Sequence, residues 1–406
     1  MSTVQNKRQR SNSGPVNYKA RPQQNRRRPQ QNKAKKVSSL DPKLLVKEAA
    51  PMKVQKDFRS DRLIKDLPIN DKLKQSLLKK GFERPTEIQD RTLEALLEGR
   101  DILGIAQTGT GKTGAFLVPI IDELLHKRSP NYALIVVPTR ELALQVEEEF
   151  ISMTRGLGLY SSCFIGGTNV NRDVQKAKRN SHVVIATPGR LLDLSDRRAI
   201  KLGGFKTLVL DEFDRMLDMG FIHDVKRILE GLKQRSHTML FSATLDKSQQ
   251  KMINKILSNP VTVKVSSGES TGDTIDQDII RLKPGEDKFD ILRDMLGSNE
   301  FEKVLLFEET KHRVSKLCVK LNKAGIPSEQ IHGNKSQNAR QSALKAFKQG
   351  RVRVLVATDV ASRGLDISNV SHVINYQVPQ THDSYIHRIG RTGRAGKAGK
   401  AFTFVA

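Results

Sequence analysis

The sequence predicts an α/β protein of two domains, each a parallel sheet flanked by helices, preceded by a disordered basic tail. Three observations support this fold class. Short β-branched apolar runs alternate with amphipathic stretches from about residue 61 onward. A segment of small and polar residues, 266–273, interrupts the alternation once, and the pattern then resumes. Tyr18 is the only aromatic residue before Phe58, so residues 1–57 have little apolar surface to offset the entropy of ordering.

The tail, residues 1–57, is also strongly charged. The chain of 406 residues has a net charge of +26, and residues 1–60 contain 16 Lys/Arg and 3 Asp/Glu. Such an excess predicts a polyanionic partner, nucleic acid first and a membrane surface second. A tail that only improves solubility is the simpler alternative. A mitochondrial presequence would also be rich in Arg, but it needs an apolar helical face, which this tail lacks.

Composition argues against several other classes. Cys163 and Cys318 lie far apart and near no metal-ligand cluster, so the sequence suggests neither a disulfide framework nor a zinc site. No uncharged apolar run approaches the ~20 residues of a membrane helix, and the N-terminus lacks the apolar core of a signal peptide. We therefore expect a reducing, cytoplasmic location and no membrane partner.

The predicted strands follow in order along the two domains. The first domain, 58–265, contains the apolar runs 101–106, 133–138, 182–187, 207–211 and 238–244. After the linker, 266–273, the second domain, 274–406, contains the runs 303–308, 352–358, 372–378 and 401–406. Near-continuous apolar strands separated by helices indicate a parallel sheet that is covered on both faces.

A Gly-rich turn follows the first predicted strand and precedes a helix. It comprises Ala106, Gln107, Thr108, Gly109, Thr110, Gly111, Lys112 and Thr113. Backbone N–H groups of such a turn bind phosphate oxygens, Lys112 would reach the terminal phosphates, and the Thr113 hydroxyl would bind Mg²⁺. Residues 109–114 also match the dinucleotide pattern G-x-G-x-x-G. No acidic residue ends a second strand as that pattern requires, so a nucleoside triphosphate is favoured.

The run "TLVLDEFD", 207–214, ends in an acidic pair. Asp211 follows a strand, where an acid can hold Mg²⁺ through a water, and Glu212 could act as a general base for the attacking water. Paired acids after a strand are common on protein surfaces, so this interpretation depends on the phosphate loop upstream. Phe213 supplies no catalytic group, and we interpret it as a packing position.

Taken together, these residues resemble the DEAD-box RNA helicases of superfamily two, from about residue 61 to the C-terminus. The resemblance rests on a dozen motifs in order, including "GFERPTEIQ" (81–89), "AQTGTGKT" (106–113), "PTRELA" (138–143), Gly166-Gly167, "TPGR" (187–190), "SAT" (242–244), Gln337 with Arg340, "ATDVASRGLD" (357–366) and "HRIGRTGR" (387–394). The box itself departs from the family pattern, because it reads D-E-F-D. The resemblance implies two RecA-like domains with ATP and Mg²⁺ as cofactors.

The resemblance also implies residue roles. Gln89, with Phe82 nearby, would select adenine, and Asp366 would contact the ribose. Arg391 and Arg394 would act as arginine fingers on the transferring phosphoryl group. Asp214, Ser242, Thr244 and His387 would couple hydrolysis to domain closure. RNA phosphates and sugars would be held, without reading of sequence, by Thr139, Arg140, Gly167, Thr187, Arg190, Arg340 and Thr358.

The expected activity is ATP-dependent unwinding or remodelling of RNA by a monomeric helicase core, with Lys112, Asp211, Glu212, Arg391 and Arg394 as catalytic residues. Two other functions stay open at this point. A DNA helicase would use similar motifs, although Gln89 and the wording of "PTRELA" favour RNA. A non-hydrolysing RNA clamp would follow if Phe213 impaired the ATPase site.

Overall fold

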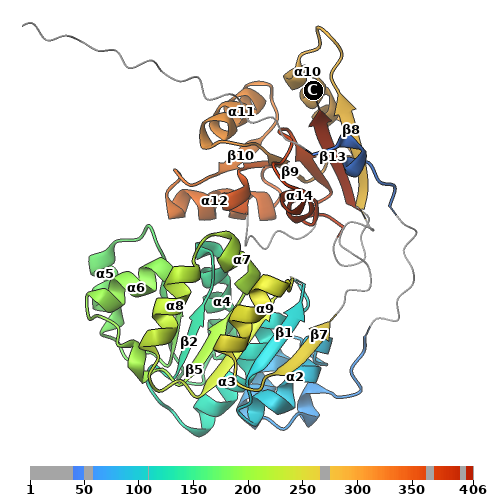
Figure 1. Cartoon of the computed structure of the whole chain (residues 1–406). Helices are drawn as coiled ribbons and strands as arrows, with labels where there is room; N and C mark the ends of the chain where they lie inside the picture. The colour runs from blue at the N-terminus through green and yellow to red at the C-terminus, as the bar shows by residue number, and fades with distance from the viewer. Residues whose placement is uncertain are drawn as a thin grey trace, which may run out of the picture. The chain divides into compact units, whose positions relative to one another are not determined.

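The computed structural model describes residues 40–49, 58–107, 109–265, 275–362, 370–393 and 399–405. Two sheets, all of whose paired strands are parallel, follow one another along the chain (Figure 1). The first sheet has the strand order β3-β4-β2-β5-β6-β1-β7, and the second has the order β10-β11-β9-β12-β13-β8. The predicted fold class is therefore confirmed. We call each sheet with its helices a lobe, the first lobe ending at Val265 and the second beginning its sheet at Ile275.

The strands are short, and most follow the apolar runs of the sequence. In the first lobe they are β1 Ile102–Ala106, β2 Ala133–Val136, β3 Ser161–Phe164, β4 Val183–Ala186, β5 Thr207–Leu210, β6 His237–Ser242 and β7 Val261–Val265. In the second lobe they are β8 Ile275–Arg281, β9 Val304–Phe307, β10 Ser328–Ile331, β11 Val354–Ala357, β12 His372–Asn375 and β13 Gly399–Val405. The sequence analysis did not name β3, β7, β8 and β10. All four lie at the edges of the sheets, where a strand has one neighbour and tolerates polar residues.

Helices supply the apolar cover of both sheets. Those of the first lobe are α1 Asp71–Lys79, α2 Glu87–Leu97, α3 Lys112–His126, α4 Arg140–Met153, α5 Val170–Ala177, α6 Pro188–Asp196, α7 Phe213–Asp218, α8 Ile222–Gly231 and α9 Lys247–Ile256, with short 3₁₀ turns at Ile64–Asp66 and Leu202–Gly204. Those of the second lobe are α10 Lys288–Gly297, α11 Lys311–Lys323, α12 Gln337–Lys348, α13 Asp359–Ser362 and α14 His382–Ile389. Among the described helices, none is long and apolar enough to span a membrane.

Each sheet separates two apolar cores, which explains the near-continuous apolar strands. In β2, Ala133 and Ile135 pack with α1 to α4, whereas Leu134 and Val136 pack with α6 to α9. The second lobe repeats this arrangement, with α12 and α14 in one core and α10 and α11 in the other. Because successive side chains of a strand point to opposite faces, both sets of side chains must be apolar. In a parallel sheet all carboxyl ends lie at one edge, so the loops after β1 to β6 meet there.

The prediction that all of residues 1–57 are disordered is wrong for residues 40–49. This segment, which we call the strap, contains a 3₁₀ turn, Pro42–Leu45, and packs on the second lobe (Figure 1, blue, beside β8). Lys47 and Gln277 of β8 exchange two backbone hydrogen bonds, of 2.9 and 2.8 Å, as an antiparallel bridge.

The strap also contributes to the core of the second lobe. Leu45 is fully buried beside Ile275 and Tyr385, and the Tyr385 hydroxyl donates to the Leu45 carbonyl at 3.4 Å. The apolar run 44–46 is too short to show a helical or strand period, so it could not be recognised within a tail of charged and polar composition. The linker 266–273 lies outside the described residues, as does residue 274.

Candidate nucleotide and nucleic-acid site

The phosphate loop lies between β1 and α3, as predicted. Gly109 and Gly111 have φ values of 94° and 95°, a conformation that residues with a Cβ rarely adopt. A Cβ on Gly111 would also lie 2.5 Å from Thr86 Oγ1, so the loop needs glycine there. No described side chain caps α3, which leaves the N–H groups of its first turn, where Thr113 lies, for an anion.

Lys112 begins α3 and is almost fully buried. Its ammonium group donates to the Ala106 carbonyl at 2.8 Å. Within the same loop, the Thr110 hydroxyl donates to the Gln107 carbonyl at 2.8 Å. Thr108, also predicted to bind the nucleotide, lies outside the described residues. A buried ammonium group at the N-terminus of a helix is suited to bind a polyphosphate.

Asp211 lies at the carboxyl end of β5 and is buried. The pKa of its carboxyl group is raised to about 6, chiefly by burial, with the Glu212 charge adding to the rise and the nearby Lys112 charge opposing it. Its carboxylate accepts a 2.9 Å hydrogen bond from the Glu212 backbone N–H. A buried acid whose charge is incompletely compensated fits a site that receives a divalent cation.

Magnesium would require the nucleotide as a co-ligand at this position. Among the described residues, no group of three or more His, Cys, Asp or Glu side chains is arranged to hold a metal ion. Mg²⁺ commonly takes only one or two protein carboxylates and completes its shell with waters and phosphate oxygens. The residues present therefore fit a magnesium–nucleotide complex, which Thr113 would bind directly and Asp211 would bind through a water.

Glu212 differs electrostatically from its neighbour. Burial favours its neutral form, but the charge of Arg215 and a hydrogen bond from it, with Lys112 and Arg391, lower the pKa of Glu212 below its usual value. Arg215 lies one turn later on α7 and pairs with the carboxylate directly. Glu212 is therefore ionised at neutral pH, as a general base must be. The sequence analysis missed Arg215, although a spacing of three residues on a helix would have indicated the pair.

Asp214 joins the acidic motif to the "SAT" motif. Its Oδ2 accepts from the backbone N–H groups of Ala243 and Thr244, at 3.1 and 2.9 Å, and from the Thr244 hydroxyl at 2.9 Å. The Asp214 N–H in turn donates to Ser242 Oγ at 3.3 Å. The acidic motif and the "SAT" motif are therefore in direct contact, whereas their role in coupling stays a prediction.

Gln89 is engaged with the phosphate loop. Its amide accepts from the Thr86 N–H at 3.0 Å and donates to the Gly111 carbonyl at 3.0 Å. This side chain therefore links α2 to the turn that would hold phosphates. Phe82 packs against the core of the first lobe, and the Lys80 ammonium group lies 5.3 Å from its ring centroid.

The candidate RNA residues of the first lobe gather at the carboxyl ends of β2, β3 and β4. Thr139 caps α4 and accepts from the Leu142 N–H at 3.3 Å, whereas Thr187 occupies the N-cap position of α6 without a side-chain capping hydrogen bond. Arg140 lies over Gly167, whose φ is 81°. Burial lowers the pKa of Arg140, and so do the nearby charges of Arg340 and Arg190, against the effect of Glu141. The positive charges of these guanidinium groups would attract a polyanion.

The second-lobe residues are only partly described. Arg340 is buried and pairs with Glu141, 2.7 Å from its carboxylate, a partner that the sequence analysis did not anticipate. Thr358 follows β11, and His387 lies exposed on α14. Arg391 is buried, and its charge contributes to the low pKa of Glu212. Asp366 and Arg394 lie outside the described residues.

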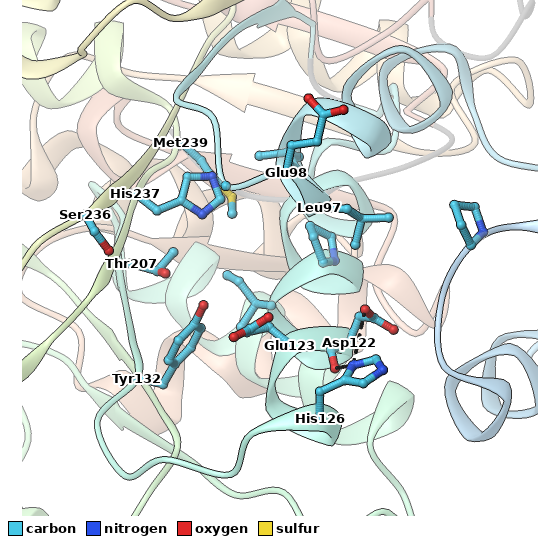
Figure 2. Close-up of a pocket in the computed structure, with 15 residues that line it drawn as sticks. Leu97, Glu98, Asp122, Glu123, His126, Tyr132, Thr207, Ser236, His237 and Met239 are labelled. Atoms are coloured by element: carbon cyan, nitrogen blue, oxygen red, sulfur yellow. Dashed lines mark hydrogen bonds and ion pairs between the residues drawn. The ribbon is translucent and has the colours of Figure 1, made fainter.

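A separate cavity of about 500 Å³ lies in the first lobe (Figure 2). Its lining includes Thr207 and His237, which begin β5 and β6, and Glu123 of α3. These strand starts form the edge opposite to the loops that carry Lys112 and Asp211. The cavity is therefore distinct from the candidate nucleotide site.

Comparisons with known proteins agree with this geometry. The DEAD/DEAH box helicase family model matches residues 86–253, and the model of the helicase conserved C-terminal domain matches residues 287–396. The ATP-dependent RNA helicase CshA of Listeria monocytogenes is 44% identical over 83% of this chain and 65% of its own length. The chain thus spans slightly less than two thirds of this curated relative.

Solved structures extend the comparison to three dimensions. S. cerevisiae Dbp5 bound to RNA and ADP BeF3 has a TM-score of 0.74 and 31% identity, over 84% of this chain and 89% of that one. Mss116p bound to ssRNA and AMP-PNP has a TM-score of 0.76 and 34% identity, over 85% of this chain and 75% of that one. By its motifs, its two parallel-sheet lobes and these relatives, the chain belongs to the DEAD-box helicase family.

Proposed function

We propose that the chain is an ATP-dependent RNA helicase, which couples ATP binding and hydrolysis to local unwinding or remodelling of RNA. The observation that carries this proposal is the convergence of Lys112, Asp211 and Glu212 at one sheet edge. Lys112 and Arg391 both contribute to the electrostatics of the acidic pair. Dbp5 and Mss116p, whose structures contain bound RNA, support RNA as the nucleic acid.

Each group of this site has a defined task in the proposed reaction. Lys112 and the N–H groups at the start of α3 bind phosphate oxygens and stabilise the negative charge that develops during transfer. Glu212 is ionised and orients the attacking water, from which it accepts a proton. A magnesium ion, when bound beside Asp211 and Thr113, supplies further neutralisation of charge on the phosphates.

Two of the three arginines of "HRIGRTGR" complete the proposed catalytic set. Arg391 and Arg394 act as arginine fingers from the second lobe, and such groups contribute large factors to phosphoryl transfer. Asp214, through the backbone and hydroxyl of Thr244, transmits the state of the acidic motif to the "SAT" segment. We propose that closure of the lobes on ATP and RNA bends the bound strand, and that hydrolysis and phosphate release reopen them.

The proposal is tested by RNA-dependent phosphate release from ATP in the presence of Mg²⁺. We expect stimulation by single-stranded RNA, weaker stimulation by DNA of the same sequence, and loss of turnover in Glu212→Gln by at least 100-fold. Equal stimulation by DNA would favour a DNA helicase instead. RNA binding by the wild type, with turnover no higher than in Glu212→Gln, would favour the non-hydrolysing clamp.

Phe213 is the residue on which the clamp alternative depends. Its ring is fully buried in the apolar core on the α6 to α9 side, where it contributes packing and no polar group. We propose that the D-E-F-D box is an active variant. Phe213→Ala should lower the free energy of unfolding by about 3–5 kcal/mol and retain RNA-stimulated hydrolysis at a temperature where it is folded. An inert wild type with turnover restored in Phe213→Ala would show that the ring disables the site.

A further inference from the structure

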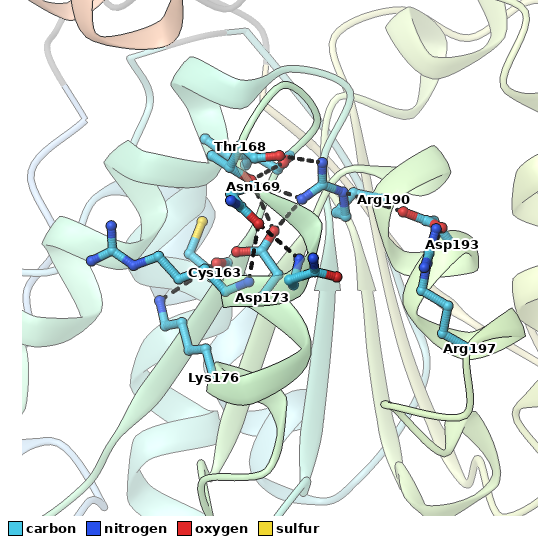
Figure 3. A network of polar contacts seen from close by, with 11 residues as sticks. Cys163, Thr168, Asn169, Asp173, Lys176, Arg190, Asp193 and Arg197 are labelled. Atoms are coloured by element: carbon cyan, nitrogen blue, oxygen red, sulfur yellow. Dashed lines mark hydrogen bonds and ion pairs between the residues drawn. The ribbon is translucent and has the colours of Figure 1, made fainter.

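Arg190 lies in a network of polar contacts that connects α6, α5 and the loop before α5 (Figure 3). Its Nη1 donates to the Thr168 hydroxyl at 2.8 Å and pairs with Asp173, and its Nη2 donates to the Thr168 carbonyl at 3.0 Å. The Thr168 hydroxyl also donates to Asp173 Oδ2 at 2.8 Å. Arg190, Asp173 and Thr168 therefore hold one another.

This network engages most of the hydrogen-bonding capacity of Arg190. The side chains of Arg190 and Asp173 are only 9% and 10% exposed, and Arg190 Nε lies 3.8 Å from Asp193 as well. A guanidinium group has five N–H donors in a fixed plane, and here both terminal nitrogens already have protein acceptors. Direct grip of an RNA phosphate, the role implied by family resemblance, would compete with these contacts.

The loop that Arg190 contacts through Thr168 also packs against the Arg140 side chain. Gly166 and Gly167 precede Thr168, and a Cβ on Gly167 would lie 2.3 Å from Arg140 Nη1. The Arg140 guanidinium thus rests directly on the backbone of this loop. A shift of Thr168 would therefore displace the surface against which Arg140 is packed.

We propose that Asp173 is a positioning residue for RNA binding, which acts through Arg190 and Thr168 on the Gly166–Gly167 backbone and on Arg140. The inference rests on the proposed RNA-dependent function and names a residue of that site which the sequence analysis did not single out. Arg190 in this scheme is also chiefly a positioning residue. The ion pair with Asp173 orients its fork toward the Thr168 carbonyl and hydroxyl.

The direction in which Asp173→Ala changes RNA affinity distinguishes a positioning role from a purely electrostatic one. Asp173 brings a negative charge close to a surface that receives a polyanion, so its removal should strengthen RNA binding if only Coulomb forces matter. Positioning predicts the opposite, because Arg190 loses its charged acceptor and the Thr168 hydroxyl loses the carboxylate that fixes it. Asp173→Ala should therefore weaken RNA binding, by about tenfold in Kd.

Asp193 provides the matched control. It also lies beside Arg190, on α6, but its side chain is 38% exposed and its ion pairs are with Arg190 and Arg197. Asp193→Ala removes the same charge from the same guanidinium and should leave RNA affinity unchanged or slightly increased. The exchanged pair, Asp173→Arg with Arg190→Asp, should recover part of the affinity that Asp173→Ala loses.

The experiment measures RNA Kd, the KM for ATP and the thermal midpoint for the full chain and each variant. We expect the RNA Kd of Asp173→Ala to rise while the KM for ATP stays close to that of the wild type, and the midpoint shows whether the variant is folded at the assay temperature. RNA affinity equal to or tighter than that of the wild type would overturn the inference, as would an equal loss in Asp193→Ala. If Asp173→Ala is unstable, failure of the exchanged pair to regain any affinity overturns it. A wild type without any response to RNA would instead contradict the proposed function.

Discussion

At the scale of single residues, the candidate site lowers the stability of the ligand-free protein, because it buries an acidic group. Asp211 is buried, and its pKa is raised to about 6 from the usual 3.8. Its ionised form therefore disfavours the folded state, whereas its neutral form does not. This destabilisation is absent below pH 3.8, where the group is protonated in both the folded and unfolded states, and it grows as the pH rises until it is complete above about pH 6. An acidic residue that is kept although its burial lowers stability is consistent with a role in binding a cation.

Replacement of Asp211 by Asn should stabilise the nucleotide-free protein while it abolishes hydrolysis. The amide keeps an oxygen for the Glu212 N–H but carries no charge to bury. The gain should reach at most about 3 kcal/mol at pH 8 and should be smaller at pH 5, where Asp211 of the wild type is mostly protonated. Thermal unfolding without Mg²⁺ at the two pH values measures it. A lower midpoint at pH 8 in Asp211→Asn would contradict the assigned electrostatics.

The sequence predicted the positions of individual residues where a motif states both residue type and position, whereas the roles of these residues stay predictions. Lys112, Asp211 and Asp214 lie where their motifs imply, because a strand–turn–helix unit fixes the backbone around them. The partners of these residues could not be found in the same way. Asp173 reaches Arg190 across 17 positions of sequence, and Glu141 reaches Arg340 across 199. Such pairs depend on how helices pack, which no local pattern encodes.

At the scale of elements, burial decided which strands the sequence revealed. The central strands are covered on both faces and read as continuous apolar runs. Edge strands such as β10, "SEQI", and β8, "IDQDIIR", alternate or carry polar residues, since solvent reaches part of them. The same reasoning explains why the strap escaped notice. Only Leu45 of its apolar run is buried, while Leu44 and Val46 remain about half exposed.

Leu45 should contribute measurably to the stability of the second lobe. Its side chain is fully buried, and its carbonyl accepts from Tyr385. We expect Leu45→Ala to lower the free energy of unfolding by about 2–5 kcal/mol. The exposed neighbour Leu44→Ala is the control and should change it by less than about 0.5 kcal/mol. Thermal or urea unfolding compares the two, and equal effects would show that the strap does not dock as described.

At the scale of the whole molecule, the net charge of +26 predicts how RNA binding depends on salt. Residues 1–39 contain 11 Lys/Arg and no Asp or Glu. Deletion of these residues should raise the RNA Kd at low salt and reduce the slope of log Kd against log salt concentration, because fewer counterions are released. Maximal turnover should change little. Titrations at 50 and 200 mM salt measure the effect.

The end point of that deletion matters for its interpretation. A chain that begins at residue 40 keeps the strap, whereas one that begins at residue 58 also removes Leu45 from the second lobe. We expect only the longer deletion to lower the thermal midpoint. A large loss of turnover in the shorter deletion would contradict the view that residues 1–39 act by charge alone.

The strap also has a consequence for biosynthesis. Leu45 leaves the ribosome 230 residues before Ile275, the first of its core neighbours on β8. At roughly 5–20 residues per second, this interval lasts on the order of ten to fifty seconds. For that time "LLV" is an unburied apolar segment on the nascent chain, beside the most basic part of the sequence. The second lobe can complete its core only after β13 has been made, and it must then bind a segment that was made more than 350 residues earlier.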